Sequence, residues 1–465
     1  MSETWLKERA AIPAGGGAGS RVEPAPGGLT TDLYELTMAA SYLRREMTGL
    51  ATFSLFLRRL PADRGFVVAV GLDDCLRFLE DFHFEPDELD YLSGLAFDEQ
   101  AIERFRRLRF TGSVRAVPEG TVVFANEPIL EVTAPIAEAQ LVETYLLNQI
   151  TFQSAIATKA ARCRIAAGDA ELIDFSFRRT HGVEAGLKAA RASAIAGFAA
   201  TSNTAAARRY GLRATGTMAH SYVQAFSSET EAFAALAADF PGRVTFVVDT
   251  YDTLSGVAHA IEVIRQQRLG GQLAIRLDSG DLRGLSIASR RLLDEAGLPK
   301  VRIVASGNLD EYEIERLVRG SASIDAFGVG TRMGVSADAP YLDSVYKLVA
   351  YDGRPVMKLS PGKATQPGAK QVFRTAAPET IGPDLLASAD EPAPDGMEPL
   401  LVPVMDNGRY VDPPRHSVAA ARARLEADLG DLPAHTLRLT SPTPVTVEIS
   451  AALHSLAKRV RSGLP

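Results

Sequence analysis

The chain has only two cysteines, Cys75 and Cys163, among 465 residues. A disulfide framework is therefore excluded, and this low cysteine usage fits a reducing cytoplasm. The surrounding residues, LDDCLRF and AARCRIA, are typical of the buried face of a helix. No run of about 18 apolar residues occurs, and residues 1–10 lack an apolar signal-peptide core, so neither a membrane span nor a secretory leader is expected.

A surplus of basic residues is also missing, because the formal net charge is −7. A broad basic face for nucleic acid is therefore not expected, and an anionic small substrate would have to meet a few local Arg and Lys side chains. A hydrophobic content of 46% and a charged content of 23% are those of an ordinary soluble enzyme. The length allows two domains.

Several common catalytic signatures do not occur in the chain. It contains no GxxxxGK[ST] loop, no HExxH, no CxxC, no GxSxG, and no GxGxxG after an early strand. These absences argue against P-loop kinases, zinc hydrolases and dinucleotide dehydrogenases.

What the chain does contain is a series of apolar runs that end in polar residues. Four β-rich runs, at 244–249, 273–278, 301–306 and 324–330, end in VVDTYDT, IRLDSGD, IVASGNLDE and FGVGTRM, and a further strand is expected at 171–175. Candidate strand ends recur at roughly 25–45 residue intervals, which is typical of βα units. The pattern predicts a parallel α/β barrel with its ligands at the carboxyl ends of the strands.

The pattern along the chain predicts four regions. Residues 1–28 are rich in Gly and Pro and are expected to form a disordered tail, residues 29–135 a small α+β domain, residues 136–350 the barrel, and residues 351–465 a segment that packs on the N-terminal domain. Within the first domain, Asp32 is expected to cap a helix, with Glu35 in a capping box, and 112–133 to form β-hairpins. In the last region, 356–359 is expected to be a strand, 377–399 a surface loop and 417–429 the only helix.

Two of the strand ends carry groups suited to phosphates or sugars. Gly328, Gly330 and Thr331 are consistent with a phosphate-binding turn or with an ordinary tight turn, and their place at the end of a strand favours phosphate binding. Asp278 and Asp281 can bind ribose hydroxyls or magnesium, although residues in such turns often cap the following helix instead.

Arginine and histidine side chains complete the set of candidates. Arg178 and Arg179 follow the strand at 171–175 and suit a carboxylate or pyrophosphate, whereas a solvated Arg pair is the simpler alternative. A lone histidine is more often structural than catalytic. His220 differs from the other histidines because small residues flank it in GTMAHS, and His181 is a weaker second candidate.

These motifs together resemble nicotinate phosphoribosyltransferase. GTMAHS, RLDSGD, VDTYD, FGVGT and the early TDLYELTMA carry the resemblance, and PVMKLS and PGAKQVFR, with Lys358 and Lys370, are similar as well. The resemblance runs from about residue 29 to residue 374. It implies an α/β fold, namely an irregular TIM-like barrel with a smaller α+β domain built from N- and C-terminal segments, assembled as a homodimer.

The resemblance also implies a reaction. The family transfers the phosphoribosyl group of 5-phosphoribosyl 1-pyrophosphate to nicotinate, giving nicotinate mononucleotide and pyrophosphate in NAD biosynthesis. It requires Mg²⁺ and uses ATP as a co-substrate through a phosphohistidine, which by resemblance is His220. Nicotinate would be bound by Tyr34, Thr217, Arg276 and Arg178, with Tyr34 acting in the neighbouring subunit's site. Phosphoribosyl pyrophosphate would be bound by Arg179, Asp278, Asp281, Ser306, Gly307, Gly328, Gly330 and Thr331.

The resemblance leaves some points open. Ser176 and Phe177 stand where the family has a Gly-containing version of the segment before Arg178. No metal ligand is assigned, because substrate phosphates supply many of the oxygens. Alternatives are a nicotinamide-preferring phosphoribosyltransferase and a non-catalytic sensor of nucleotides or phosphoribosyl pyrophosphate. An aldolase-like barrel is disfavoured, because none of the four strand ends offers a lysine. Neither a nucleic acid nor a membrane is expected as a partner.

Overall fold

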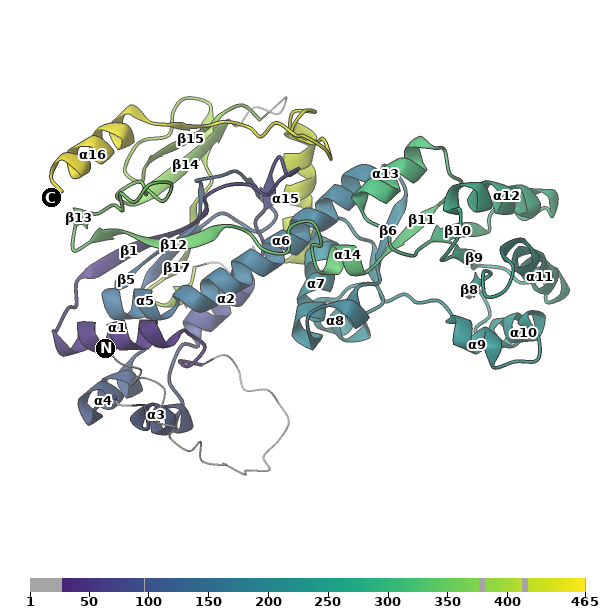
Figure 1. The fold of residues 1–465 in the computed structure, drawn as a ribbon, viewed down its shortest axis with the longest axis horizontal. Helices are drawn as coiled ribbons and strands as arrows, with labels where there is room; N and C mark the ends of the chain where they lie inside the picture. Colours follow the sequence, from purple (N-terminus) through teal and green to yellow (C-terminus); the bar gives the residue numbers. More distant parts are fainter. Residues whose placement is uncertain (1–26, 96, 376–380, 412–416, 465) are drawn as a thin grey trace, which may run out of the picture.

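The computed structural model describes residues 27–95, 97–375, 381–411 and 417–464, which form two lobes (Figure 1). The lobe at the left of Figure 1 contains both ends of the chain, and the lobe at the right contains a curved sheet wrapped by helices. The long helix α6 (Glu143–Ala167) extends from one lobe into the other. Of the tail expected to be disordered, residues 1–26 lie outside the described residues.

The N-terminal lobe is organised around a seven-stranded antiparallel sheet. Its strand order is β13 (Arg354–Pro355), β12 (Ser344–Tyr351), β1 (Leu50–Leu57), β5 (Pro128–Pro135), β3 (Ser113–Ala116), β17 (Val402–Asp406) and β18 (Arg409–Tyr410). Every residue of β1 after Leu50 is buried, because this strand has a neighbour on each side and is covered on both faces. The N-terminal helices are α1 (Leu33–Arg44), α2 (Leu72–Glu80), α3 (Pro86–Ser93), α4 (Glu99–Arg107) and α5 (Ile136–Leu141).

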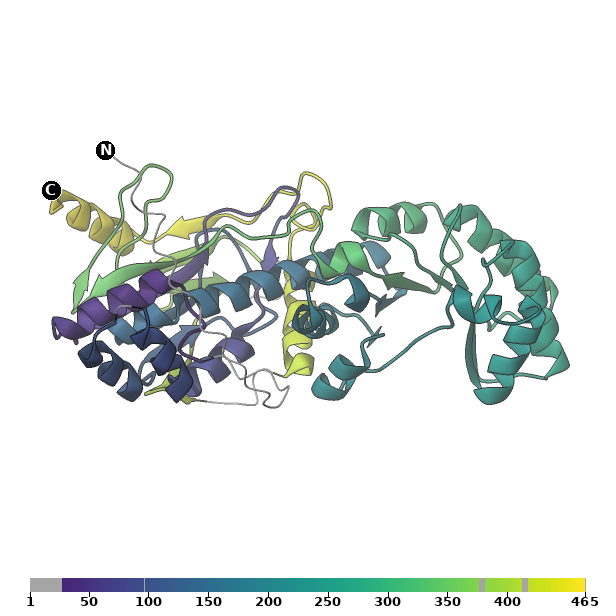
Figure 2. The same cartoon turned by 60° about the horizontal axis from the view of Figure 1, so that its bottom comes forward.

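The C-terminal segment adds a second sheet to this lobe. Its strands lie in the order β16 (Met397–Pro399), β14 (Lys370–Thr375), β15 (Asp384–Ser388) and β19 (Val447–Ile449). The helices of this segment are α15 (Val418–Asp431) and α16 (Ala451–Ser462). Because β17 and β18 extend the sheet of the N-terminal residues, segments from both ends of the sequence build one lobe (Figure 2).

The second lobe is a parallel sheet of six strands that curls into a half-barrel. The order is β7 (Ala200–Thr201), β6 (Glu171–Asp174), β11 (Ala326–Val329), β10 (Arg302–Ala305), β9 (Gln272–Leu277) and β8 (Arg243–Val247). The expected α/β fold with a barrel-like sheet is confirmed. Its irregularity is that, within the described residues, β7 and β8 share no hydrogen bond and leave the barrel open on one side. Six strands are fewer than the roughly eight that close a barrel of this kind.

Helices cover the outer surface of the half-barrel. They are the single turn η1 (Phe177–Arg179), α7 (Val183–Ile195), α8 (Thr204–Tyr210), α9 (His220–Gln224), α10 (Glu229–Asp239), α11 (Thr253–Gln266), α12 (Leu282–Glu295), α13 (Glu311–Arg319) and α14 (Thr331–Gly334). Most connections alternate strand and helix, as the spacing of the strand ends predicts. Between β7 and β8 the chain instead makes a single bridge, Thr201 to Ala214, and then reaches α9.

Several local predictions in the N-terminal region are corrected by the structure. Asp32 precedes α1 but makes no capping bond, because its carboxylate accepts from the Thr144 hydroxyl at 2.8 Å, so no capping box forms with Glu35. The segment 112–133 is not a run of consecutive hairpins. In it β3 pairs with β5, while β4 (Val122–Val123) leaves this sheet to pair with β2 (Val67–Val68). Long-range pairing therefore overrides the local turn signals.

The C-terminal region differs from expectation as well. Residues 356–359 are not a strand, the described part of the expected loop 377–399 contains β15 and β16, and α16 is a second helix beyond α15. Both cysteines are buried on helices, as expected, with Cys75 in α2 and Cys163 in α6. No helix within the described ranges is long and apolar enough to cross a membrane.

Candidate active site

The carboxyl edge of the half-barrel gathers polar groups from five neighbouring elements. Parallel strands end at the same edge of a sheet, so residues far apart in the sequence meet there. The residues concerned are Ser176 after β6, Thr217 before α9, Asp249 and Thr250 after β8, Asp278 after β9 with Arg276 on it, and Ser306 after β10.

Arg276 is the centre of this group. Its guanidinium donates from Nε to the Ser306 hydroxyl at 2.7 Å, from Nη1 to the Thr217 hydroxyl at 2.8 Å and from Nη2 to Asp278 Oδ1 at 2.6 Å. Its Cζ atom lies 5.7 Å from the centre of the Phe175 ring. A guanidinium has more N–H groups than these three bonds use, so a rigidly oriented cation keeps donors for a ligand.

Asp278 is ionised by the same contacts. Burial by itself favours the neutral carboxyl, but hydrogen bonds from Ser306 at 2.5 Å and from Arg276 outweigh burial and lower the pKa of Asp278 below its usual value. The arrangement therefore places a fixed negative charge beside Arg276 at neutral pH.

His220 begins α9 and faces two carboxylates. Its Nδ1 lies 3.1 Å from the Thr250 hydroxyl, and its Nε2 lies 3.9 Å from Asp249 Oδ1 and 3.8 Å from Asp278 Oδ2. The imidazole is 40% exposed, whereas the Asp249 side chain is 2% exposed. A histidine that is accessible on one side and oriented by carboxylates on the other is suited to nucleophilic chemistry.

Asp249 is a site residue that sequence reasoning did not single out. Its Oδ2 accepts from the Asp278 backbone N–H at 2.9 Å and from the Ser279 hydroxyl at 2.7 Å. Its Oδ1 is buried and accepts no hydrogen bond from any residue that the structure describes. The signal was present in VDTYD, which marks the end of β8, but the sequence alone did not distinguish this carboxylate from Asp252, the N-cap of α11.

The loop after β6 is held by a buried carboxylate. Asp174 Oδ1 accepts from the backbone N–H and the hydroxyl of Ser176, at 2.9 and 2.6 Å, and Oδ2 accepts from Thr201 at 2.7 Å. Arg178 and Arg179 follow in η1 and are both exposed. Arg179 Nη1 lies 3.4 Å from the Thr331 hydroxyl, which brings the ends of β6 and β11 together.

Different structural constraints apply at the three glycines that the sequence places in the site. Gly307 has φ +94°, and a Cβ there would lie 2.1 Å from the Asp278 carbonyl oxygen, so this turn after β10 requires glycine. At Gly328 a Cβ would lie 2.5 Å from the Phe175 ring, so packing inside the half-barrel explains this residue. Gly330 has more space, with its nearest neighbour at 3.4 Å, and it precedes Thr331 at the start of α14.

The loops after β10 and β11 are tied to the long helix between the lobes. Glu311, at the start of α13, is fully buried and pairs with Lys159 at 2.6 Å and Arg162 at 2.9 Å, both on α6. Asp310 accepts from Arg332 of α14 at 2.8 Å. Buried ion pairs that share hydrogen bonds impose one geometry, so the loop 306–310 has a fixed position.

Two of the predicted residues are not part of this group. Asp281 is the N-cap of α12 and is exposed, although its side chain makes no capping bond. Tyr34 lies on α1, at the far end of the other lobe from α9 (Figure 1). Its hydroxyl donates to Glu35 at 3.1 Å, and burial raises the pKa of Glu35 to about 7.

The described residues contain no group of three or more His, Cys, Asp or Glu side chains arranged to hold a metal ion. Within the described residues, Asp249 and Asp278 are the two carboxylates of this edge that face His220. Two carboxylates suit Mg²⁺. This ion keeps several waters and is usually bound by one or two carboxylates together with the phosphates of the substrate.

Comparisons with known proteins cover nearly the whole described chain. The family model "Nicotinate phosphoribosyltransferase (NAPRTase) family" matches residues 170–377, and the models of the NAPRTase N-terminal and C-terminal domains match residues 29–151 and 391–457. The chain is 49% identical to nicotinate phosphoribosyltransferase pncB2 of Mycobacterium tuberculosis over 88% of each protein. It is 32% identical to the human nicotinate phosphoribosyltransferase over 94% of this chain and 97% of that protein.

Solved structures share the fold. The crystal structure of human nicotinic acid phosphoribosyltransferase superposes with a TM-score of 0.82 at 30% identity, covering 92% of this chain and 99% of that one. A nicotinate-nucleotide pyrophosphorylase from Pyrococcus furiosus superposes with a TM-score of 0.71 at 26% identity, covering 86% of this chain and 96% of that one. The resemblance found in the sequence is thus confirmed, and the chain belongs to the nicotinate phosphoribosyltransferase family.

Proposed function

We propose that the protein transfers the phosphoribosyl group of 5-phosphoribosyl 1-pyrophosphate to nicotinate and couples this transfer to ATP hydrolysis. The observation that carries the proposal is Arg276, a cation fixed by three hydrogen bonds at the carboxyl edge of the half-barrel with donors left for an anion. Membership of the family supports the choice of substrates. The product is nicotinate mononucleotide, so the reaction belongs to NAD biosynthesis, and a cytoplasmic location is consistent with two free, buried cysteines.

Nicotinate binds with its carboxylate on Arg276 and the Thr217 hydroxyl. Its ring nitrogen is already a nucleophile, so the site must orient the ring rather than remove a proton. The nitrogen attacks the anomeric carbon of the ribose, the bond from that carbon to the pyrophosphate oxygen breaks, and pyrophosphate leaves with the electron pair. Arg178, exposed in η1, lies at the same edge and adds positive charge for the anionic ligand.

Phosphoribosyl pyrophosphate occupies the neighbouring loops. The fixed turn at Ser306 and Gly307, the start of α14 at Thr331 and the exposed Arg179 supply hydroxyl, N–H and guanidinium donors. Negative charge grows on the pyrophosphate as it departs, and donors already fixed in place stabilise that charge without reorganisation. Asp278 lies on the same side and is suited to the ribose hydroxyls.

His220 accepts the phosphoryl group of ATP. The two carboxylates face Nε2 and favour a proton on that nitrogen, which leaves the lone pair on Nδ1, beside Thr250. Nδ1 attacks the γ-phosphorus, the bond between the γ-phosphorus and the bridging oxygen breaks, and ADP leaves. Asp249 and Asp278 balance the positive charge of the phosphorylated imidazole.

Mg²⁺ is the cation that the family requires. The carboxylates of Asp249 and Asp278 would hold it, together with substrate phosphates and water. Asp249 Oδ1 is buried and accepts no hydrogen bond from a described residue. When bound, the ion would neutralise charge on the departing pyrophosphate.

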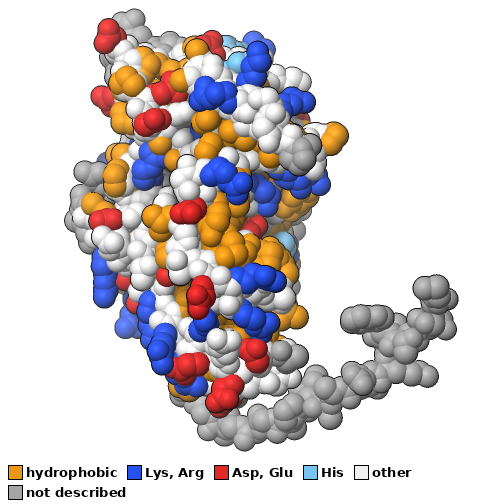
Figure 3. Space-filling view, turned by 90° about the vertical axis from the view of Figure 1, so that its left-hand side faces the viewer, with side chains coloured by type: hydrophobic (Ala, Val, Ile, Leu, Met, Phe, Trp, Pro, Cys, Tyr) orange, Lys and Arg blue, Asp and Glu red, His pale blue; other side chains and the backbone are white. Residues whose placement is uncertain are grey.

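A homodimer would bring Tyr34 to the site. Within one chain, α1 and α9 lie in opposite lobes (Figure 1), and Leu33 and Tyr34 on α1 are 57% and 51% exposed. Seen from the end of the N-terminal lobe, the surface carries hydrophobic side chains interspersed with charged ones (Figure 3). Both features are consistent with a second copy of the chain covering α1.

The dimer predicts complementation between two impaired variants. If Tyr34 acts in the partner's site, a mixture of Tyr34→Ala and His220→Ala chains, refolded together, forms heterodimers with one intact site. Activity should then recover to about a quarter of the wild-type value, because about half of the dimers are mixed and each has one intact site of two. Recovery is measured as nicotinate mononucleotide formed. Unmixed variants carried through the same treatment are the control, and activity no higher than theirs would contradict a site shared between two chains.

The function is tested by assaying pyrophosphate and nicotinate mononucleotide formed from nicotinate, phosphoribosyl pyrophosphate and Mg²⁺, with and without ATP. A parallel reaction contains nicotinamide. We expect product from nicotinate, stimulated by ATP, and little product from nicotinamide. Preferential use of nicotinamide would support the alternative enzyme, and tight binding of phosphoribosyl pyrophosphate without pyrophosphate release would support the sensor.

A further inference from the structure

The inside of the half-barrel is hollow below the proposed active site. Side chains on a strand alternate between its two faces, so the inward residues form layers. Under the layer of Arg276 and Ser306 lies a small apolar cluster, separate from the main core and made of Ile173, Ala200, Ala274, Val304 and Ala326. Barrel interiors are normally filled by bulky branched residues, and the three alanines leave space instead.

A cavity of about 260 Å³ opens beneath this cluster, at the amino ends of the strands. Four cationic side chains and one carboxylate line it, namely Arg213, Arg243, Lys300, Arg302 and Glu171. Glu171 pairs with both Arg213 and Arg302, at 2.8 Å from the latter. In the described part of the chain, neither Arg243 nor Lys300 has a carboxylate within ion-pair distance, so the rim has uncompensated positive charge.

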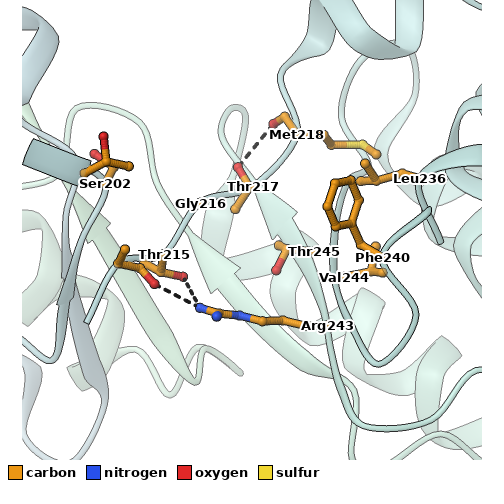
Figure 4. A pocket seen from close by; sticks show the side chains of 12 residues that line it. Ser202, Thr215, Gly216, Thr217, Met218, Leu236, Phe240, Arg243, Val244 and Thr245 are labelled. Atoms are coloured by element: carbon orange, nitrogen blue, oxygen red, sulfur yellow. Dashed lines mark hydrogen bonds between the residues drawn. The ribbon is translucent and has the colours of Figure 1, made fainter. Parts of the chain in front are cut away.

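The open side of the half-barrel connects this cavity to the layer above. A second cavity, of about 500 Å³, lies between β8 and the segment after β7 and shares Thr215, Arg243 and Thr245 with the first. It extends to Thr217, the hydroxyl partner of Arg276. Figure 4 shows Thr217 above, Thr245 in the middle and Arg243 below, with the guanidinium pointing across the opening.

The exposed side chain of Arg243 is held across the opening by two hydrogen bonds. Its Nη2 donates to the Ala214 carbonyl oxygen at 3.1 Å and to the Thr215 hydroxyl at 3.4 Å (Figure 4). Both bonds use the same nitrogen, so Nε and Nη1 remain for a ligand. The hollow therefore has an arginine with free donors at each end, Arg276 above and Arg243 below, with hydroxyls and small apolar side chains between them.

We propose that this basal cavity is a second, non-reactive binding site for a small aromatic carboxylate, with its carboxylate on Arg243 and its ring against the alanine-rich layer. The choice of nicotinate as the physiological occupant rests on the proposed function, whereas the site itself follows from the charges and the cavity. Lys300 adds charge at the rim. A ligand bound here lies on the route along the open side of the half-barrel toward Thr217. The site would therefore collect nicotinate at the amino ends of the strands, opposite to the loops that bind phosphoribosyl pyrophosphate.

The experiment counts bound nicotinate by equilibrium dialysis of the full chain with labelled nicotinate, without phosphoribosyl pyrophosphate or ATP. We expect two molecules per chain for the wild type, one each for Arg276→Gln and Arg243→Gln, and none for the double variant. Arg291→Gln is the matched control, because Arg291 is an exposed arginine on α12 that lines neither cavity. It should bind two. Two molecules on Arg243→Gln, or none on Arg276→Gln, would overturn the proposal.

Competition on Arg276→Gln tests the chemistry of the ligand. Benzoate keeps the ring and the carboxylate and should displace nicotinate, whereas nicotinamide lacks the charge and should not. Displacement by nicotinamide, or by inorganic phosphate at the same concentration as benzoate, would contradict an aromatic carboxylate site. Because these readouts require no catalysis, they separate failure of this proposal from failure of the proposed function, which the product assay of the wild type reports.

Discussion

His220→Ala is expected to abolish nicotinate-dependent ATP hydrolysis while leaving a slow, ATP-independent transfer of the phosphoribosyl group. The first effect follows because His220 is the histidine that faces the carboxylates of Asp249 and Asp278. The second follows because Arg276, Ser306 and Thr331, which bind the substrates in the proposed mechanism, are unchanged. ADP and nicotinate mononucleotide are measured in the same reaction, and their ratio reports the coupling.

The matched control for this variant is His259→Ala. His259 is 41% exposed, close to the 40% of His220, and its Nδ1 also lies near a carboxylate, at 2.8 Å from Glu229. It lies on α11, away from the strand ends, so its removal should change neither rate nor coupling. ATP turnover that survives in His220→Ala at the wild-type ratio to product would exclude His220 as the phosphoryl acceptor.

A phosphohistidine accelerates the reaction only if the phosphorylated enzyme binds the substrates or the transition state better than the free enzyme does. Wild-type protein incubated with ATP and Mg²⁺ alone should therefore bind phosphoribosyl pyrophosphate more tightly than protein without ATP. His220→Ala should show one affinity under both conditions. This comparison isolates the coupling from the chemical step.

Arg276→Gln is expected to raise the KM for nicotinate by about ten- to a hundredfold, the equivalent of a charged hydrogen bond of about 1.5–3 kcal/mol. The KM for ATP should change much less, because the nucleotide has no contact with this side chain in the proposed mechanism. The variant should also lose its preference for nicotinate over nicotinamide, since the amide gains nothing from the cation. Initial rates with each base, at saturating phosphoribosyl pyrophosphate, give both quantities.

Removing Arg276 also removes one hydrogen bond each from Asp278 and Thr217, so a control for structure is needed. Arg290→Gln is suitable, because Arg290 is 22% exposed, comparable to the 14% of Arg276, and holds backbone carbonyls of Leu298 and Val301 outside the site. It should leave the KM for nicotinate unchanged. Equal increases of the KM for nicotinate and for ATP in Arg276→Gln would assign Arg276 a structural role only.

The carboxyl edge of the half-barrel could be predicted because its signals are local. Each strand is apolar along its length and ends in polar residues, and parallel strands place their ends together whatever their order in the sheet. Arg276, Asp278, Ser306 and His220 were therefore found from the sequence, and the structure brings them within hydrogen-bond or ion-pair distance of one another. Asp249 was missed because nothing local distinguishes a carboxylate that faces the histidine from one that caps a helix.

The sequence by itself determined the alternation of strands and helices after residue 170, the burial of both cysteines and the family, because each depends on residue type and on near neighbours in the chain. Only the tertiary structure decided which strands pair: that β12 joins β1, that β4 leaves its hairpin for β2, and that β7 and β8 remain apart. Those choices depend on contacts between residues tens to hundreds of positions apart, which local pattern does not encode. The open side of the half-barrel, the cavity at Arg243 and the distance of Tyr34 from His220 all follow from them.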